Sequence, residues 1–191
     1  LVLLGLAQYV INLGYRAVAT MNDTALAIPY ALKAGLGEYG RHGLLITKEF
    51  GPRVRIGKIF TDLPLAHDYP KNFGVTEFCK ICRRCSDACP VNAIPDGQPS
   101  DVVYNKSNIR GVRKWTVDAE PCFKFWTNQN SDCSICVRVC PYNRDLTGFW
   151  SRVWLWLAGT PLRRIALWMA DLFTPFNRVS PSVWWRKGRQ S

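Results

Sequence analysis

The sequence Cys79-Lys-Ile-Cys82-Arg-Arg-Cys85-Ser-Asp-Ala-Cys89-Pro90 decides the fold of the central part of this 191-residue chain. Three thiolates at three-residue intervals on a tight loop reach three corners of one iron–sulfur cube. Cys89 lies too far along the chain to close that cube, and Pro90 follows it where a first helical turn tolerates proline. We therefore expect Cys89 to reach a second cluster.

A second copy of the motif lies 51 residues further on, where Cys133, Cys136, Cys140 and Pro141 repeat the spacing of Cys82, Cys85, Cys89 and Pro90. The first run is the C-x2-C-x2-C-x3-C-P run of bacterial ferredoxins, and the second block is Cys122-x10-Cys133-x2-Cys136-x3-Cys140-Pro141. The eight cysteines then divide into two sets of four with none left over. The expected crossed sets are Cys79, Cys82, Cys85 and Cys140 for one cluster, and Cys89, Cys122, Cys133 and Cys136 for the other.

Other uses of cysteine fit this pattern less well. A disulfide scaffold does not require C-x2-C pairs at this density with a repeated Cys-Pro. Zinc sites use separated pairs or mixed Cys/His sets, and His42 and His67 both lie far from these cysteines in the sequence. Free buried thiols would not recur at a fixed offset. The pattern predicts two [4Fe–4S] clusters.

The net charge of the chain is lower once the clusters are counted. The sequence holds 25 Lys and Arg against 14 Asp and Glu, a formal charge of +11. Eight thiolates and two oxidised cluster cores of two positive charges each bring the holoprotein to about +7. Much of this excess lies after residue 150, so the charge does not indicate nucleic acid as a partner.

The fold class we expect is α+β, with three parts at 1–76, 77–148 and 149–191. Periodicity and breakers predict a helix over 1–13 ended by Gly14, a strand over 15–20, and a helix over 24–33 capped by Asn22 or Asp23. A glycine-rich loop follows at 34–43. Two apolar strands, 44–48 and 54–61, are expected to flank a hairpin turn at 49–53.

The segment 149–191 is rich in tryptophan and arginine. Its longest uncharged run, 153–162, is ten residues, whereas a membrane span needs roughly 20. It is either an interfacial helix that docks at a membrane or, as we favour, an amphipathic terminal helix that packs on its own domain. Six of the eight tryptophans lie here: Trp150, Trp154, Trp156, Trp168, Trp184 and Trp185.

Several longer motifs resemble the corrinoid-dependent reductive dehalogenases, in order, from about residue 5 to 145. The resemblance would cover only the C-terminal portion of a complete family member, and the chain opens on Leu1, so we expect a piece of a longer protein. The motifs are Asn22-Asp-Thr-Ala-Leu-Ala-Ile-Pro29, Ala34-Gly-Leu-Gly-Glu-Tyr-Gly-Arg41, Gly43-Leu-Leu-Ile-Thr47, Gly51-Pro-Arg-Val-Arg55, Phe60-Thr-Asp-Leu-Pro-Leu65 and Phe73-Gly-Val-Thr-Glu-Phe-Cys79.

The resemblance implies a partial nitroreductase-like α/β domain, ahead of the ferredoxin-like module, that holds a base-off corrinoid. A flat macrocycle needs close backbone approach, which glycine permits. No D-x-H-x-x-G motif surrounds His42 or His67, which agrees with base-off binding, and we expect both to be ordinary surface or loop residues. The candidate corrinoid-binding residues are Gly35, Leu36, Gly37, Gly40, Arg41 and Gly43.

The activity that the resemblance implies is R–X + 2e⁻ + H⁺ → R–H + X⁻ at a Co(I) corrinoid fed by the clusters, in anaerobic organohalide respiration. Arg55 is the candidate cation beside a proton-donating tyrosine, or else a surface arginine paired with an acid. Asn22 either lines the substrate pocket or caps a helix. The tyrosine is expected upstream of residue 1, so this chain alone is expected to be inactive.

The implied partners are an organohalide, a low-potential electron donor and a small membrane anchor subunit. The implied location is the exoplasmic face of the membrane after twin-arginine export, or alternatively the cytoplasm. Two other functions stay open: the related tRNA-modifying epoxyqueuosine reductase, and a ferredoxin-type electron-transfer module. The coding sequence upstream of Leu1 would separate the three.

Overall fold

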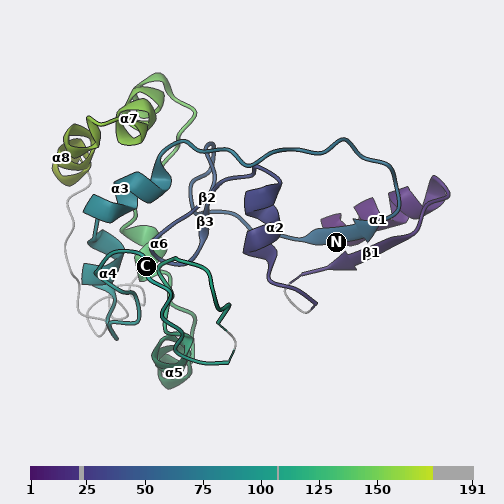
Figure 1. Cartoon of the computed structure of the whole chain (residues 1–191), viewed down its shortest axis with the longest axis horizontal. Helices are drawn as coiled ribbons and strands as arrows, with labels where there is room; N and C mark the ends of the chain where they lie inside the picture. Colours follow the sequence, from purple (N-terminus) through teal and green to yellow (C-terminus); the bar gives the residue numbers. More distant parts are fainter. Residues whose placement is uncertain (22–23, 107, 174–191) are drawn as a thin grey trace, which may run out of the picture.

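The computed structural model describes residues 1–21, 24–106 and 108–173. Helix α1 (Val2–Asn12) is followed by Gly14, whose φ of 91° ends the helix as predicted. Strand β1 (Ala17–Thr20) pairs antiparallel with β4 (Lys58–Thr61), from Ala17 opposite Thr61 to Thr20 opposite Lys58. In Figure 1 this strand pair and α1 lie at the opposite end of the molecule from the last two described helices.

The middle of the N-terminal segment holds helix α2 (Ala27–Lys33) and two very short strands. β2 (Glu38–Tyr39) and β3 (Leu45–Ile46) pair antiparallel across the glycine-rich loop. The predicted cap of α2 is wrong, because the helix begins after Leu26, a residue with no capping side chain. Residues 22 and 23 lie outside the described residues.

The predicted hairpin over 44–61 is also wrong. Its two segments pair with different partners, β3 with β2 and β4 with β1. Only an isolated bridge between Thr47 and Gly51 closes the turn. Gly51 has a φ of 58°, and Pro52 has no N–H for a ladder, so the pairing cannot continue and the chain leaves toward α1.

The cysteine-rich part is a set of short helices joined by turns. α3 (Val75–Ile81) and α4 (Arg84–Ala88) carry the first motif, α5 (Ala119–Gln129) lies apart, and α6 (Ile135–Arg138) carries the second motif. The buried carboxylate of Glu38 accepts hydrogen bonds from the backbone N–H groups of Phe73 (2.6 Å) and Val75 (3.2 Å). These backbone N–H groups have no partner within the helix, so the carboxylate of Glu38 on β2 satisfies them and fixes the start of α3.

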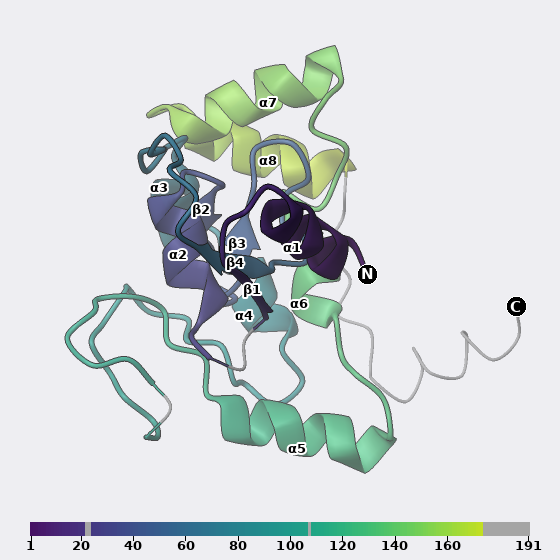
Figure 2. The same ribbon diagram turned by 90° about the vertical axis from the view of Figure 1, so that its right-hand side faces the viewer.

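Helices α7 (Phe149–Gly159) and α8 (Arg163–Phe173) pack on each other, and α7 packs on α3. Figure 2 shows α7 and α8 side by side, with α5 at the far side of the molecule. The end of α7 approaches α3 very closely, because a Cβ on Gly74 would meet the Cα of Gly159 at 2.5 Å. Gly74 also has a φ of 90°, so only glycine suits the position.

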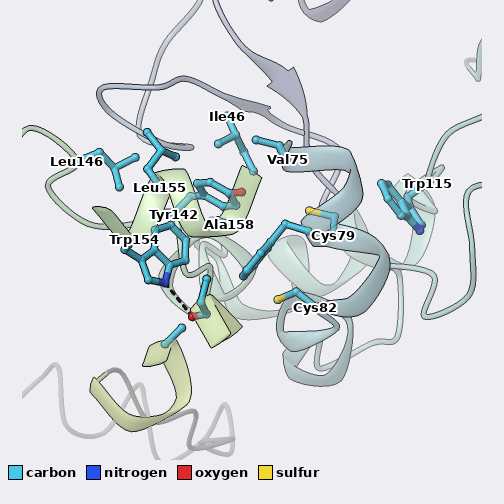
Figure 3. Packing of buried hydrophobic residues seen from close by; sticks show 13 residues of the cluster. Ile46, Val75, Cys79, Cys82, Trp115, Tyr142, Leu146, Trp154, Leu155 and Ala158 are labelled. Atoms are coloured by element: carbon cyan, nitrogen blue, oxygen red, sulfur yellow. Dashed lines mark hydrogen bonds between the residues drawn. The ribbon is translucent and has the colours of Figure 1, made fainter. Parts of the chain in front are cut away.

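The main core lies between α3, α7 and α8. Phe78, Tyr142 and Trp154 form a triangle of edge-to-face contacts, with ring centroids 5.1 to 5.6 Å apart, as part of the cluster shown in Figure 3. The indole N–H of Trp154 donates to the carbonyl of Ala166 at 2.8 Å. Such contacts add to the area that each ring buries, so α7 and α8 are built into the domain rather than appended to it.

The tail therefore packs on its own domain as far as residue 173, as the favoured interpretation of the sequence predicts. Trp154 is buried, whereas the side chains of Trp150, Trp156 and Trp168 are exposed. Trp184 and Trp185 lie outside the described residues. Among the helices that the structure describes, none combines the length and apolar character needed to cross a bilayer.

Candidate functional site

The four cysteines of the first predicted set line one cavity. Cys79 lies on α3, Cys82 ends that helix, Cys85 lies on α4, and Cys140 follows α6. Arg41, His42, Phe78, Pro141 and Tyr142 complete the wall. α4 and α6 are in contact, so the fold brings Cys140 of the second motif to the three cysteines of the first.

Three cysteines of the second predicted set lie around another apolar cluster, to which Cys85 of the first set also belongs. Cys89 is buried there with Ala93 and Ile94, and Cys122 and Cys136 pack against them. The backbone N–H of Ala93 donates to Cys89 Sγ at 3.2 Å. Asp118 caps the start of α5: its carboxylate accepts from Glu120 N, and its own N–H donates to Ala93 O. This links the helix that carries Cys122 to the turn after Cys89.

The eight thiols are not arranged for a single metal ion. Within the described part of the chain, no three His, Cys, Asp or Glu side chains gather as ligands of one ion would. They surround two sites instead, and the chemistry of four thiols at each is that of a [4Fe–4S] cluster. The residues present therefore fit two such clusters.

Burial favours the protonated form of several of these thiols. It raises the pKa of Cys79 and of Cys136 from 9.0 to about 12, and neighbouring cysteines add to the effect. The pKa of Cys140 is also raised, mainly by burial and then by Cys79. Because clusters bind thiolates, cluster insertion must displace these protons.

We expect the apoprotein, if it keeps this packing, to lose stability in alkali. A thiol with a raised pKa favours the folded state below its unfolded pKa of about 9, and this contribution disappears as the pH rises toward about 12. The free energy of unfolding of the apoprotein should therefore fall between about pH 9 and about pH 12. Urea unfolding of apoprotein and holoprotein at both ends measures this, and an equal pH dependence in the two would contradict it.

Arg41 is the most completely engaged side chain near the first set. It is 1% exposed and lies over the ring of Trp115, with 4.8 Å from its Cζ to the centroid. Its Nη2 donates to Cys79 O at 2.7 Å, its Nε donates to Cys82 O at 3.1 Å, and its Nη1 donates to the carbonyls of Pro95 and Gly97, each at 2.8 Å. The guanidinium holds the backbone of the first cysteine motif against the loop that ends in β3.

The glycines of the 34–43 loop are explained by the packing of the chain itself. A Cβ at Gly35 or Gly37 would collide with the carbonyl oxygens of Tyr69 and Ile46. A Cβ at Gly40 or Gly43 would meet the side chains of His42 and Val117. Leu36 is exposed. Packing within the chain therefore accounts for these glycines, and the assignment of the 34–43 loop to corrinoid binding stays a prediction.

The remaining sequence candidates lie elsewhere. Arg55 is exposed in the segment before β4, and it does not line the cavity of the first cysteine set. Asn22 lies outside the described residues. His67 is exposed and His42 lies in a loop, as expected, but the side chain of His42 is buried, which the sequence did not indicate. Gly40 has no side chain in the space that the His42 ring occupies. This glycine, two residues before His42, is the feature of the sequence that could have indicated the burial.

Two sets of four cysteines, each at its own site, define a double-cluster iron–sulfur protein, and residues 78–143 match the family model of a 4Fe-4S double cluster binding domain. A tetrachloroethene reductive dehalogenase of Desulfitobacterium hafniense is 48% identical over 145 residues, which are 73% of this chain and 26% of that protein. A solved reductive dehalogenase, presented with a mechanism for B12-dependent dehalogenation, matches with a TM-score of 0.77 and 32% identity over 91% of this chain and 25% of its own.

The chain belongs to the reductive dehalogenase family. It spans about a quarter of the length of the dehalogenases it matches. The family is related to epoxyqueuosine reductase, whose Lactococcus garvieae member is 34% identical over 131 residues, 66% of this chain and 35% of that protein.

Proposed function

We propose that this chain is the electron-delivering part of a reductive dehalogenase that converts an organohalide R–X to R–H and X⁻ with two electrons and one proton. The observation that carries the proposal is the gathering of Cys140 with Cys79, Cys82 and Cys85 in one cavity beside the 34–43 loop. The similarity to dehalogenases supports the reaction class.

The burial of the two sites suggests the direction of electron flow. Three of the four cysteines of the second set are partly exposed and only Cys89 is buried, whereas three of the four cysteines of the first set are buried and only Cys140 is partly exposed. Electrons from a soluble or membrane-bound donor would therefore enter at the second cluster and leave through the first. Arg41 holds the backbone around the first cluster in place during this transfer.

The proposal includes a corrinoid, supported by the similarity to the B12-dependent enzyme. When bound, the corrinoid supplies the cobalt centre at which the carbon–halogen bond breaks. We further propose a nitroreductase-like fold for the α/β part, a low-potential donor, and a location at the exoplasmic membrane face after twin-arginine export, with a small anchor subunit. The exposed Trp150, Trp156 and Trp168 suit a membrane-facing side of the molecule.

The test uses the complete protein purified without oxygen. We expect about eight irons and one corrinoid per chain, and halide release from tetrachloroethene with reduced methyl viologen as donor. Protein heated until its clusters are lost is the control. A complete protein that takes up clusters but no corrinoid would contradict the dehalogenase proposal, and turnover of epoxyqueuosine tRNA without halide release would assign it to the related reductases.

A further inference from the structure

Two buried polar atoms belong to the wall of the first cysteine cavity and have no protein partner. They are Nε2 of His42 and the hydroxyl oxygen of Tyr142. Both residues line the cavity together with Cys79, Cys82, Cys85 and Cys140. Because a buried polar group without a hydrogen bond is costly, its presence calls for an explanation.

The hydrogen bonds of His42 make Nε2 a donor. The backbone N–H of Leu44 donates to Nδ1 at 3.2 Å, so Nδ1 carries a lone pair and not a proton. A neutral imidazole has its one proton on the other nitrogen. The absence of a Cβ at Gly40 leaves room for the ring in this position. His42 therefore presents an N–H group in a cavity where sulfur is the available acceptor.

The position of the Tyr142 ring is fixed by packing. The side chain is fully buried and makes edge-to-face contacts with Phe78 and Trp154 at 5.4 and 5.1 Å. In Figure 3 its hydroxyl lies on the side of the ring toward Cys79. The internal repeat adds an independent observation, since the matching position after Cys89-Pro90 is Val91, which has no hydroxyl.

We propose that His42 and Tyr142 donate hydrogen bonds to sulfur atoms of the first [4Fe–4S] cluster and so raise its reduction potential. The proposal rests on the assignment of Cys79, Cys82, Cys85 and Cys140 to that cluster. Reduction makes the cluster more negative, and donors to sulfur stabilise the more negative state. The second cluster has Val91 in place of Tyr142, so the two donors favour electron transfer from the second cluster to the first.

Redox titration of the holoprotein, followed by electron paramagnetic resonance, tests the proposal. The first cluster is identified as the signal that Cys140→Ala removes. We expect Tyr142→Phe to shift its reduction potential downward and to leave the second cluster unchanged. Tyr39→Phe is the matched control, because the Tyr39 hydroxyl is part-buried and already donates to Trp115 O at 3.2 Å, outside the cavity. It should shift neither cluster.

His42 is tested without a substitution, since a change beside Gly40 could prevent folding. In protein labelled with 15N-histidine, the reduced first cluster should show magnetic coupling to a histidine nitrogen, and an exchangeable proton coupling that Tyr142→Phe diminishes. If both couplings are absent and the potential stays unchanged while both clusters are present, the proposal is overturned and the cluster assignment survives. If the unsubstituted protein holds no cluster at the first set, the assignment fails and the proposal with it.

Discussion

Cys140→Ala should remove the cluster whose other three ligands lie in the opposite motif. Cys140 is part of the same cavity wall as Cys79, Cys82 and Cys85, so loss of its thiolate opens a corner of that cluster and leaves the other one intact. The iron content should fall from about eight to about four per chain. Iron analysis together with Mössbauer spectroscopy under anaerobic conditions measures the loss.

Double variants separate crossed from uncrossed pairing. If the sets are crossed, Cys79→Ala combined with Cys140→Ala still removes one cluster, because both residues serve the same one. Cys79→Ala combined with Cys89→Ala then removes both, although these two cysteines lie in the same motif. The reverse pattern, with two clusters lost in the first pair, would show that each motif binds its own cluster.

Arg41→Met should be the most damaging change of a residue outside the cysteines. It leaves the carbonyls of Cys79, Cys82 and Pro95 without their shared donor in a buried place, whereas Gly97 O keeps the indole N–H of Trp115. At about 1 kcal/mol for each unsatisfied carbonyl, the free energy of unfolding should fall by about 3 kcal/mol or more. Anaerobic urea unfolding of the holoprotein measures this, and the first cluster should be released before the second.

Two further variants show whether the geometry of Arg41 matters. Arg41→Lys keeps the charge but not the planar fork of donors, so it should recover only part of the loss. Arg53 is the matched control, because it is exposed and its donors reach the carbonyls of Arg144 (2.6 Å) and Phe50 (3.4 Å) at the surface. Arg53→Met should change stability by no more than about 0.5 kcal/mol. A similar loss in both methionine variants would contradict the role given to Arg41.

The two cluster sites could be predicted from the sequence because the ligands of a [4Fe–4S] cluster follow a short, fixed spacing. Strand pairing was not, because β3 and β4 are too short to set their partners and Pro52 stops the hairpin between them. The role of Arg41 was hidden for another reason. Its acceptors are backbone carbonyls up to 56 residues away, which leave no trace in side-chain patterns.

The same difficulty applies to His42 and to the tail. A histidine in a glycine-rich loop is read as exposed unless the packing behind the loop is known, and that packing comes from Ile46 and from the cysteine motif. The interleaved Trp and Arg residues of 149–173 left two interpretations open. The contact of Gly159 with Gly74 decided between them, since close approach of two backbones depends on positions far apart in the chain.

The crossed grouping also bears on how the protein matures in the cell. Cys140 lies 61 residues beyond Cys79, and the helices that pack behind the first cavity follow later still. Because synthesis proceeds from the N-terminus, the first three cysteines leave the ribosome well before the fourth and before Trp154 and Ala166. The complete four-cysteine site of the first cluster therefore exists only after translation has passed Cys140, so assembly of that cluster is a late step in the folding of this chain.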